Sequence, residues 1–169
     1  SQNNNNIYGD ALEKDRHLPG IYDDVELILS GALQIEKVQV VPIIGKKSAK
    51  VIVWVNNRGL ETTTSLKFLV HRYQTDSIVG AVETASFSIK SNESKLVEVE
   101  IPITNCKLWS PEHPNLYALT TKSDNDQLET RFGMREFHFD RETKVPTLNN
   151  RPYYLRGTSV PFFRYIENP

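Results

Sequence analysis

The sequence alternates apolar and polar residues along several short runs, and this alternation limits the folds open to the chain. In the clearest run, "KLVEVEIPI" (residues 95–103), four branched apolar residues alternate with Glu98, Glu100 and Pro102. Successive side chains of a β-strand point to opposite faces, so this run predicts a strand with one buried face. No segment of about 11 residues shows a helical period with capping residues. We therefore predict an all-β fold.

Similar runs recur about every 10 to 15 residues with turn residues between them, a spacing typical of a β-sandwich of about seven strands. Alternation predicts strands at residues 25–29 and 34–44, the second with Pro42 at an edge or a bulge. Residues 50–57 are apolar on both faces, which predicts a central strand covered on both sides, with Trp54 in the core. Further strands are predicted over residues 65–73, 85–89, 95–103, 116–122, 128–133 and 135–139, with a hairpin turn at residues 123–127.

The inward positions of these runs predict one core between two sheets. A chain of 169 residues buries about two thirds of its unfolded surface, so it needs neither a disulfide nor a metal to stabilise a core. The single Cys106 then reads as a small hydrophobic residue rather than a nucleophile. The residues predicted to form the core are Val51, Val53, Val55, Leu66, Phe68, Val97, Val99 and Ile101.

The segment "WSPEHPNLY" (residues 109–117) is an unusually rigid and aromatic connector between two of these runs. Proline fixes its own φ and disfavours a helical conformation in the residue before it, so Pro111 and Pro114 exclude a helix here. We expect a structural corner, with Trp109 largely buried and both prolines on the surface side of the bend. The segment contains no nucleophile, base or ligand set.

Charge and hydropathy argue against two classes of partner. Twenty basic and 21 acidic residues give a net charge of −1, and neither sign is concentrated in one block. We therefore expect no nucleic-acid partner. No apolar run approaches the roughly 20 residues of a membrane span, and the polar "SQNNNN" start is unlike a signal peptide, so we expect no membrane partner.

No group of residues has the spacing of a metal or catalytic site. The four histidines, at positions 17, 71, 113 and 138, lack a short metal-ligand spacing. The "DND" at residues 124–126 lacks the Gly and Glu of a calcium loop and reads as a turn, and Asn92 in "NES" matters as a glycosylation sequon only in a secretory eukaryotic host. The acids lie on outward strand positions or in turns, so we predict neither catalytic residues nor a cofactor or metal site.

Four segments, taken in order, resemble the middle part of glycoside hydrolase family 2 enzymes, the β-galactosidases, β-glucuronidases and β-mannosidases. Their order and spacing make the resemblance more specific than any one motif, and together they extend from residue 19 to the end of the chain. They are "PGIYDDVELI" (residues 19–28), "WSPEHPNLYAL" (109–119), "RFGMREF" (131–137) and "LNNRPYYLRGT" (148–158).

In that family a jelly roll is followed by an immunoglobulin-like sandwich and then by a (β/α)8 catalytic barrel. The resemblance thus implies that residues 1–20 are a flexible lead-in from a preceding jelly roll, that 21–142 form the immunoglobulin-like sandwich, and that 143–169 hold a linker hairpin and the first barrel strand. That strand would be "YYLRG" (residues 153–157), with Arg156 and Ser159 next to the active site of the parent enzyme. The family's two catalytic glutamates lie on later barrel strands, so the resemblance implies that these 169 residues alone are not an enzyme.

Two functional hypotheses follow from the sequence. In the first, the chain is a non-catalytic module that braces the catalytic barrel of a glycosidase, with neighbouring domains of the parent chain as partners and a carbohydrate substrate reached through the parent enzyme. By family analogy that enzyme is a secreted or periplasmic bacterial protein. The alternative is an independent carbohydrate-binding or adhesive sandwich. In the first hypothesis the apolar residues after Pro146 lack their barrel neighbours and should be disordered or buried against another copy; they are Leu148, Tyr153, Leu155, Phe162 and Phe163.

Overall fold

A computed structural model describes residues 25, 27 and 29–157 of the chain. The chain divides into two compact units, of which the larger, Leu29–Tyr154, contains every described strand. The smaller unit combines Ser1–Ile28 with Leu155–Pro169. Of that smaller unit only residues 25, 27 and 155–157 are described, and none of them lies in a strand.

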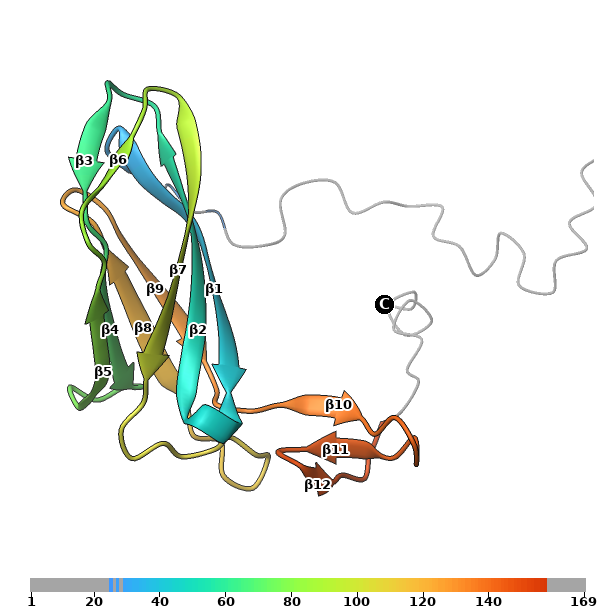
Figure 1. Cartoon of the computed structure of the whole chain (residues 1–169). Helices are drawn as coiled ribbons and strands as arrows, with labels where there is room; N and C mark the ends of the chain where they lie inside the picture. Colours follow the sequence, from blue (N-terminus) through green and yellow to red (C-terminus); the bar gives the residue numbers. More distant parts are fainter. Residues whose placement is uncertain (1–24, 26, 28, 158–169) are drawn as a thin grey trace, which may run out of the picture. The chain divides into compact units, whose positions relative to one another are not determined.

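The larger unit is built on a three-stranded and a four-stranded antiparallel sheet (Figure 1). The first has the order β1-β2-β7 and consists of β1 (Leu33–Ile43), β2 (Ser48–Asn57) and β7 (Glu93–Pro102). The second has the order β5-β4-β8-β9 and consists of β4 (Lys67–Arg72), β5 (Ile78–Glu83), β8 (Tyr117–Lys122) and β9 (Gln127–Phe132). Because the chain crosses between the sheets after β2, after β5 and after β7, these seven strands form the predicted immunoglobulin-like sandwich.

Short elements complete the larger unit. A 3₁₀ turn, η1 (Ile44–Lys46), joins β1 to β2, and β3 (Thr62–Thr64) pairs with β6 (Phe87–Ile89). A separate three-stranded sheet, which we call the terminal sheet, consists of β10 (Phe137–Phe139), β11 (Pro146–Leu148) and β12 (Arg151–Pro152).

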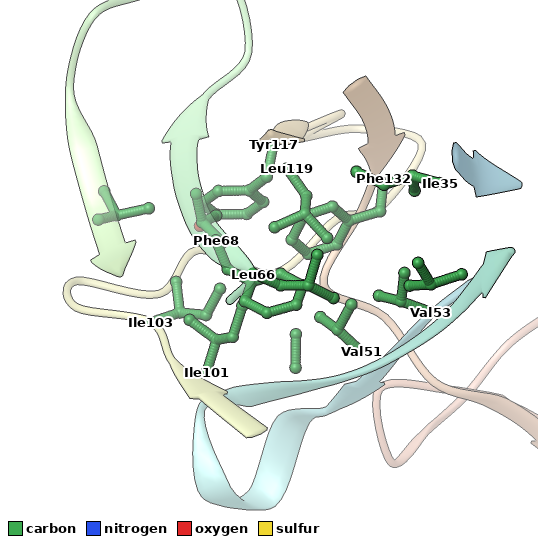
Figure 2. Close-up of a cluster of buried hydrophobic side chains, with 14 of the residues drawn as sticks. Ile35, Val51, Val53, Leu66, Phe68, Ile101, Ile103, Tyr117, Leu119 and Phe132 are labelled. Carbon is green, nitrogen blue, oxygen red and sulfur yellow. The ribbon is translucent and has the colours of Figure 1, made fainter. Parts of the chain in front are cut away.

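The core fills the space between the two large sheets, as the alternation predicted (Figure 2). Six of the eight predicted core residues have no exposed surface: Val51, Val53, Val55, Leu66, Phe68 and Ile101. The other two, Val97 and Val99, are half-buried and pack against the same cluster. Missing from the prediction were buried residues of β8 and of the segment after β9, chiefly Tyr117, Leu119 and Met134.

The edge strand β1 contains Pro42, in agreement with the predicted edge position. Its register against β2 shifts between Ile35 and Lys37, so the bulge lies nearer the start of the strand than Pro42. Beside the bulge, the Ile35 amide donates to a carboxylate oxygen of Asp126 at 2.7 Å. The turn between β8 and β9 thereby provides a hydrogen-bond acceptor for a backbone amide of the edge strand β1.

The strand predicted at residues 25–29 was wrong, and two strands of the larger unit were missed. Val25, Leu27 and Leu29 alternate with other residues, but they are exposed and lie outside any strand, because no described strand pairs with them. Strands β3 and β5 were missed: β3 is a run of three threonines, and Gly80 interrupts the pattern of β5. A Cβ at Gly80 would lie 2.6 Å from the Pro102 carbonyl oxygen, so only glycine permits this approach of β5 to β7.

Strand β2 is central, as predicted, but it is not covered on both faces. Its inner residues are buried, whereas Ile52 and Trp54 are half-buried on the outer face of the three-stranded sheet. Trp54 pairs across the sheet with Lys37 and Leu96, and the Lys37 ammonium lies 5.1 Å from the centre of its ring. A sandwich of two sheets covers only one face of each sheet, so Trp54 does not belong to the core.

The terminal sheet contains the hairpin predicted after the sandwich. Asn149 and Asn150 form its two-residue turn with φ angles of 53° and 62°, the left-handed conformation that asparagine tolerates in such hairpins. The "YYLRG" segment at residues 153–157 is not a strand, contrary to expectation, because it pairs with none of the described strands. Ser159, Phe162 and Phe163 lie outside the described residues.

Candidate functional site

The segment between β7 and β8 is tied to the sandwich by the first residue of β8. The Tyr117 hydroxyl accepts a hydrogen bond from the Lys107 amide at 2.7 Å and donates to the Lys107 carbonyl at 3.1 Å. This is the tyrosine corner of immunoglobulin-like domains, and it explains why the tyrosine ring is fully buried. The sequence contained the signal, a Tyr at the start of a strand that follows a crossover.

Trp109 occupies the corner beside residues of the segment that follows β9. Its indole lies against Gly133, where an added Cβ would be 3.0 Å from the Trp109 Cβ, and the Arg135 guanidinium lies 4.4 Å from the ring centre. The Trp109 amide donates to the Met134 carbonyl at 2.9 Å. Trp109 is half-buried rather than largely buried as predicted, because it lies in the connection outside the strands, where a guanidinium rather than the apolar core covers its ring.

The bend after Trp109 is closed by local hydrogen bonds. The Ser110 and His113 backbones donate to each other's carbonyls at 3.0 and 3.1 Å. Pro111 and Pro114 are both exposed, as expected for the surface side of the bend. The corner is therefore rigid without contributing to the core.

Asn149, in the hairpin turn of the terminal sheet, connects this sheet to the corner. Its side-chain amide donates to the Trp109 carbonyl at 2.9 Å, and its side-chain oxygen accepts from the Glu136 amide at 3.1 Å. The Glu136 carboxylate in turn accepts from the Ile44 amide of η1 at 2.9 Å. We call Trp109, Gly133, Arg135, Glu136 and Asn149 the Trp109 junction. It links the terminal sheet to both the corner and the β1–β2 connection.

A shallow cleft of about 600 Å³ lies between the corner and the hairpin of the terminal sheet. Ser110 and His113 line it from the corner, and Asn149, Arg151 and Tyr153 line it from the hairpin. Its walls come from the two segments that the Trp109 junction joins, so its shape depends on that junction.

Two carboxyl groups with shifted pKa values, Glu100 and Asp140, do not suit the general acid of glycoside hydrolysis. A hydrogen bond from the Ser48 hydroxyl at 2.6 Å lowers the pKa of Glu100, and the Thr143 amide lowers the pKa of Asp140. A general acid of glycoside hydrolysis needs a raised pKa, so neither carboxyl fits that role. Burial raises the pKa of the Cys106 thiol, which keeps it protonated and poorly nucleophilic at neutral pH.

Metal binding and membrane spanning find no support in the described part of the chain. Among residues 25, 27 and 29–157, no three His, Cys, Asp or Glu side chains gather closely enough to hold a metal ion. The same residues include no helix with the length and apolar character needed to cross a membrane.

The predicted site residues lie in three different environments. Phe68 is fully buried in the sandwich core, and Arg156 is exposed in the stretch that follows the terminal sheet. Trp54 lies on the outer sandwich face, where Lys37 covers its ring; a free aromatic face is what stacking on a sugar requires, so this arrangement argues against a sugar-binding platform. Sequence reasoning missed Gly133, Arg135 and Asn149 as partners of Trp109, because residues far apart in the sequence form the junction.

Comparison with known sequences agrees with this geometry. The sequence profile described as "Glycosyl hydrolases family 2" matches residues 33–135, more than half of the chain. A curated protein of Formosa agariphila, named "Putative beta-glucuronidase", is 40% identical over 82 residues, which are 46% of this chain and 10% of that protein. A β-galactosidase of Leuconostoc mesenteroides is 37% identical over 68 residues, which are 37% of this chain and 6% of that protein.

Solved structures share the fold at lower sequence identity. The crystal structure of a β-glucuronidase from Bacteroides uniformis aligns with a TM-score of 0.62 and 20% identity over 76% of this chain and 17% of the other. A β-galacturonidase from Eisenbergiella tayi, bound to galacturonate, aligns with a TM-score of 0.61 and 22% identity over 73% of this chain and 21% of the other. The chain therefore spans about a fifth or less of the length of these relatives.

Proposed function

The chain belongs to family 2 of the glycosyl hydrolases, and from this premise we propose that it is the non-catalytic sandwich of a glycosidase and braces that enzyme's catalytic barrel. The parent enzyme would hydrolyse O-glycosyl bonds with carboxylates that lie outside the described residues. The sandwich would hold the polypeptide that enters the barrel in a fixed orientation.

The observation that carries the proposal is the Trp109 junction. Three of the four segments that resemble the family lie far apart in the sequence, yet Trp109, Arg135 and Asn149, one from each segment, meet there. The Asn149 side chain ties the hairpin of the terminal sheet to the corner through the Trp109 carbonyl at 2.9 Å. Glu136, whose amide donates to Asn149 at 3.1 Å, also accepts from the Ile44 amide at 2.9 Å, which adds a tie to the β1–β2 connection. Such a connection suits a brace, because it limits rotation of the segment that leaves the sandwich.

The substrate of the parent enzyme is inferred from the relatives. Their names include a β-glucuronidase, a β-galactosidase and a β-galacturonidase, which act on β-linked hexoses or hexuronic acids. We propose a substrate of this class for the parent enzyme. Arg156 and Ser159, which follow the terminal sheet, remain our candidates for residues adjacent to its active site.

The first test compares two proteins on nitrophenyl β-galactoside, β-glucuronide, β-galacturonide and β-mannoside. We expect the full-length gene product to hydrolyse at least one of them and the 169-residue chain to hydrolyse none, because a retaining mechanism needs two carboxyl groups held about 5 to 5.5 Å apart. Turnover by the 169-residue chain above a heat-treated control would contradict the assignment of catalysis to another domain.

A second test addresses bracing in the full-length gene product. Trp109→Ala removes the ring between Gly133 and Arg135 and should lower kcat, because it loosens the junction that orients the following polypeptide. Trp54→Ala is the matched control, since Trp54 is also half-buried beneath a cation but lies on the outer sandwich face. Equal kcat values for the two variants would exclude bracing through the junction.

A further inference from the structure

One face of the terminal sheet presents contiguous apolar side chains to solvent. Phe137 and Phe139 are 47% and 57% exposed, and their rings pack edge to face with centres 5.6 Å apart. Leu148 and Pro146 lie directly opposite them on β11, and cross-strand partners share a face of the sheet. We call Phe137, Phe139, Pro146 and Leu148 the β10–β11 apolar face.

This face differs from the scattered apolar residues on the sandwich surface. Leu69 and Leu96 are exposed to a similar degree, 42% and 50%, but they lie on different sheets of the sandwich, in β4 and in β7. Isolated exposed apolar residues are ordinary, whereas contiguous ones mark surfaces that contact another molecule or domain. The β10–β11 apolar face is also held in place by the Trp109 junction, through the Glu136 amide just before β10 and Asn149 just after β11.

We propose that the β10–β11 apolar face is the surface on which the catalytic portion of the same polypeptide docks, an inference that rests on the function proposed above. The match to the family profile ends at residue 135, directly before β10, so the terminal sheet lies between the sandwich and whatever follows. In the solved relatives the aligned part is only 17% to 21% of the chain, which leaves a large remainder to provide the occupant.

The size of the face favours a partner in the same polypeptide over a second copy. A stable complex between separate proteins buries about 1,600 Å² in total, far more than a face built on four side chains provides. A covalently tethered partner is held at an effective concentration in the millimolar range when the linker is short, so a small apolar contact suffices. On the function proposed above, the catalytic portion would follow strand β12, which ends at Pro152, and would be tethered in this way.

The test introduces serine at both phenylalanines, Phe137→Ser with Phe139→Ser, in the full-length gene product. Leu69→Ser with Leu96→Ser is the matched control, since it removes equally exposed apolar side chains from the sandwich surface. We expect calorimetry of the unaltered gene product and of the control to show one shared unfolding transition. The Phe137/Phe139 variant should show two transitions and faster amide exchange over residues 137–148. A single shared transition with unchanged exchange in that variant would overturn the proposal.

Two further measurements separate the possible failures. In the 169-residue chain the Phe137/Phe139 variant should keep the melting temperature of the unaltered chain, and sedimentation should show a monomer for both. A dimer that the substitutions dissolve would assign the face to a second copy and overturn the proposal. If the Phe137/Phe139 variant loses the shared transition but the unaltered gene product has no glycosidase activity, the docking surface is supported and the proposed function is refuted.

Discussion

The sandwich and the terminal sheet are both antiparallel β-structures, but they place their large apolar side chains in opposite environments. In the sandwich, residues such as Val53 and Phe68 lie between two sheets and have no exposed surface. In the terminal sheet, every residue of β10 is exposed, and no second sheet within the described residues covers it.

The difference shows that strand pairing and burial are separate sources of stability. The sandwich is stabilised mainly by apolar surface removed from water, at about 25 cal/mol per Å². The terminal sheet is short, and its position depends on a few hydrogen bonds at the Trp109 junction and on one half-buried ring. Small isolated sheets of this kind are marginal in water unless they pack against something else.

Truncation of one phenylalanine in each region tests the comparison most directly. Phe68→Ala leaves a cavity in the core and should lower the free energy of unfolding by about 3 to 5 kcal/mol. Phe137→Ala removes a half-exposed ring and should cost about 1 kcal/mol or less. Chemical denaturation of both variants measures the difference. Equal losses would mean that the terminal sheet is as integral to the cooperative unit as the core.

Alanine at two glycines compares how tightly the regions are packed. A Cβ at position 80 would lie 2.6 Å from the Pro102 carbonyl oxygen, which is backbone, so Gly80→Ala should cost about 1 to 3 kcal/mol. At position 133 the new Cβ would lie 3.0 Å from the Trp109 Cβ, a milder overlap than 2.6 Å, so Gly133→Ala should cost less. Gly45→Ala is the control, because nothing lies within 4 Å of the added atom. The denaturation midpoint should fall most for Gly80→Ala, less for Gly133→Ala and least for Gly45→Ala. A larger loss for Gly133→Ala than for Gly80→Ala would show that the junction is packed more tightly than the sandwich.

Removal of the Tyr117 hydroxyl tests the tie between the corner and the sandwich. Tyr117→Phe keeps the buried ring but leaves the Lys107 amide without its 2.7 Å acceptor, which should cost about 1 to 2 kcal/mol. Tyr73→Phe is a suitable control, since the Tyr73 hydroxyl accepts an exposed hydrogen bond from the Arg131 guanidinium at 3.3 Å. Equal stability of the two variants would show that the tyrosine corner is dispensable.

The same hydroxyl gives the sandwich a pH dependence of predictable sign. Burial raises the pKa of Tyr117 above its usual value, so the folded state retains this proton at a pH where the unfolded state loses it. The stabilisation is therefore fully present below about pH 10, the usual tyrosine pKa, and is lost as the pH rises through the folded-state value. As the pH rises through that value, the free energy of unfolding should fall less in Tyr117→Phe than in the unaltered chain. Denaturant unfolding at a series of pH values measures the difference.

Glycine at the hairpin turn should release the terminal sheet and leave the sandwich intact. Asn149→Gly accepts the φ of 53° but removes the hydrogen bonds to Trp109 and Glu136, for a local cost of about 1 kcal/mol. Asn150→Gly has the same backbone requirement, with a φ of 62°, and serves as the control. Amide exchange should accelerate over residues 137–152 in the first variant only, while the main unfolding transition stays in place. Acceleration throughout the sandwich would show that the two regions unfold together.

The sandwich was predictable from the sequence because its stabilising pattern is local. Alternation with a period of two marks an inward face within a single strand, so Val51, Val53 and Phe68 could be placed before any pairing was known. Strand β5 was not predicted because Gly80 interrupts its alternation. Glycine is needed there because the Pro102 carbonyl of β7 lies too close for a Cβ. Residues 25–29 show the reverse case, an alternating run without a described pairing partner.

The junction was only partly predictable because its contacts are between distant residues. The prolines and Trp109 marked a corner, and the family resemblance gave the order of the motifs. Nothing in the spacing indicated that Arg135 lies over Trp109 or that Asn149 bonds to its carbonyl, 40 residues away. The burial of Trp109 was overestimated because an aromatic residue beside prolines can lie either in the core or at the edge of a domain.

The chain has two tryptophans, and the fold puts one on the sandwich and the other at the junction that holds the terminal sheet. Trp54 lies beneath Lys37 on the sandwich, and Trp109 lies beneath Arg135 at the junction. Because indole emission responds to the polarity of its surroundings, each ring is a separate optical reporter. With Trp54→Phe in place, only the junction would emit. A red shift at constant circular dichroism would then record the detachment of the terminal sheet as it happens, without a label.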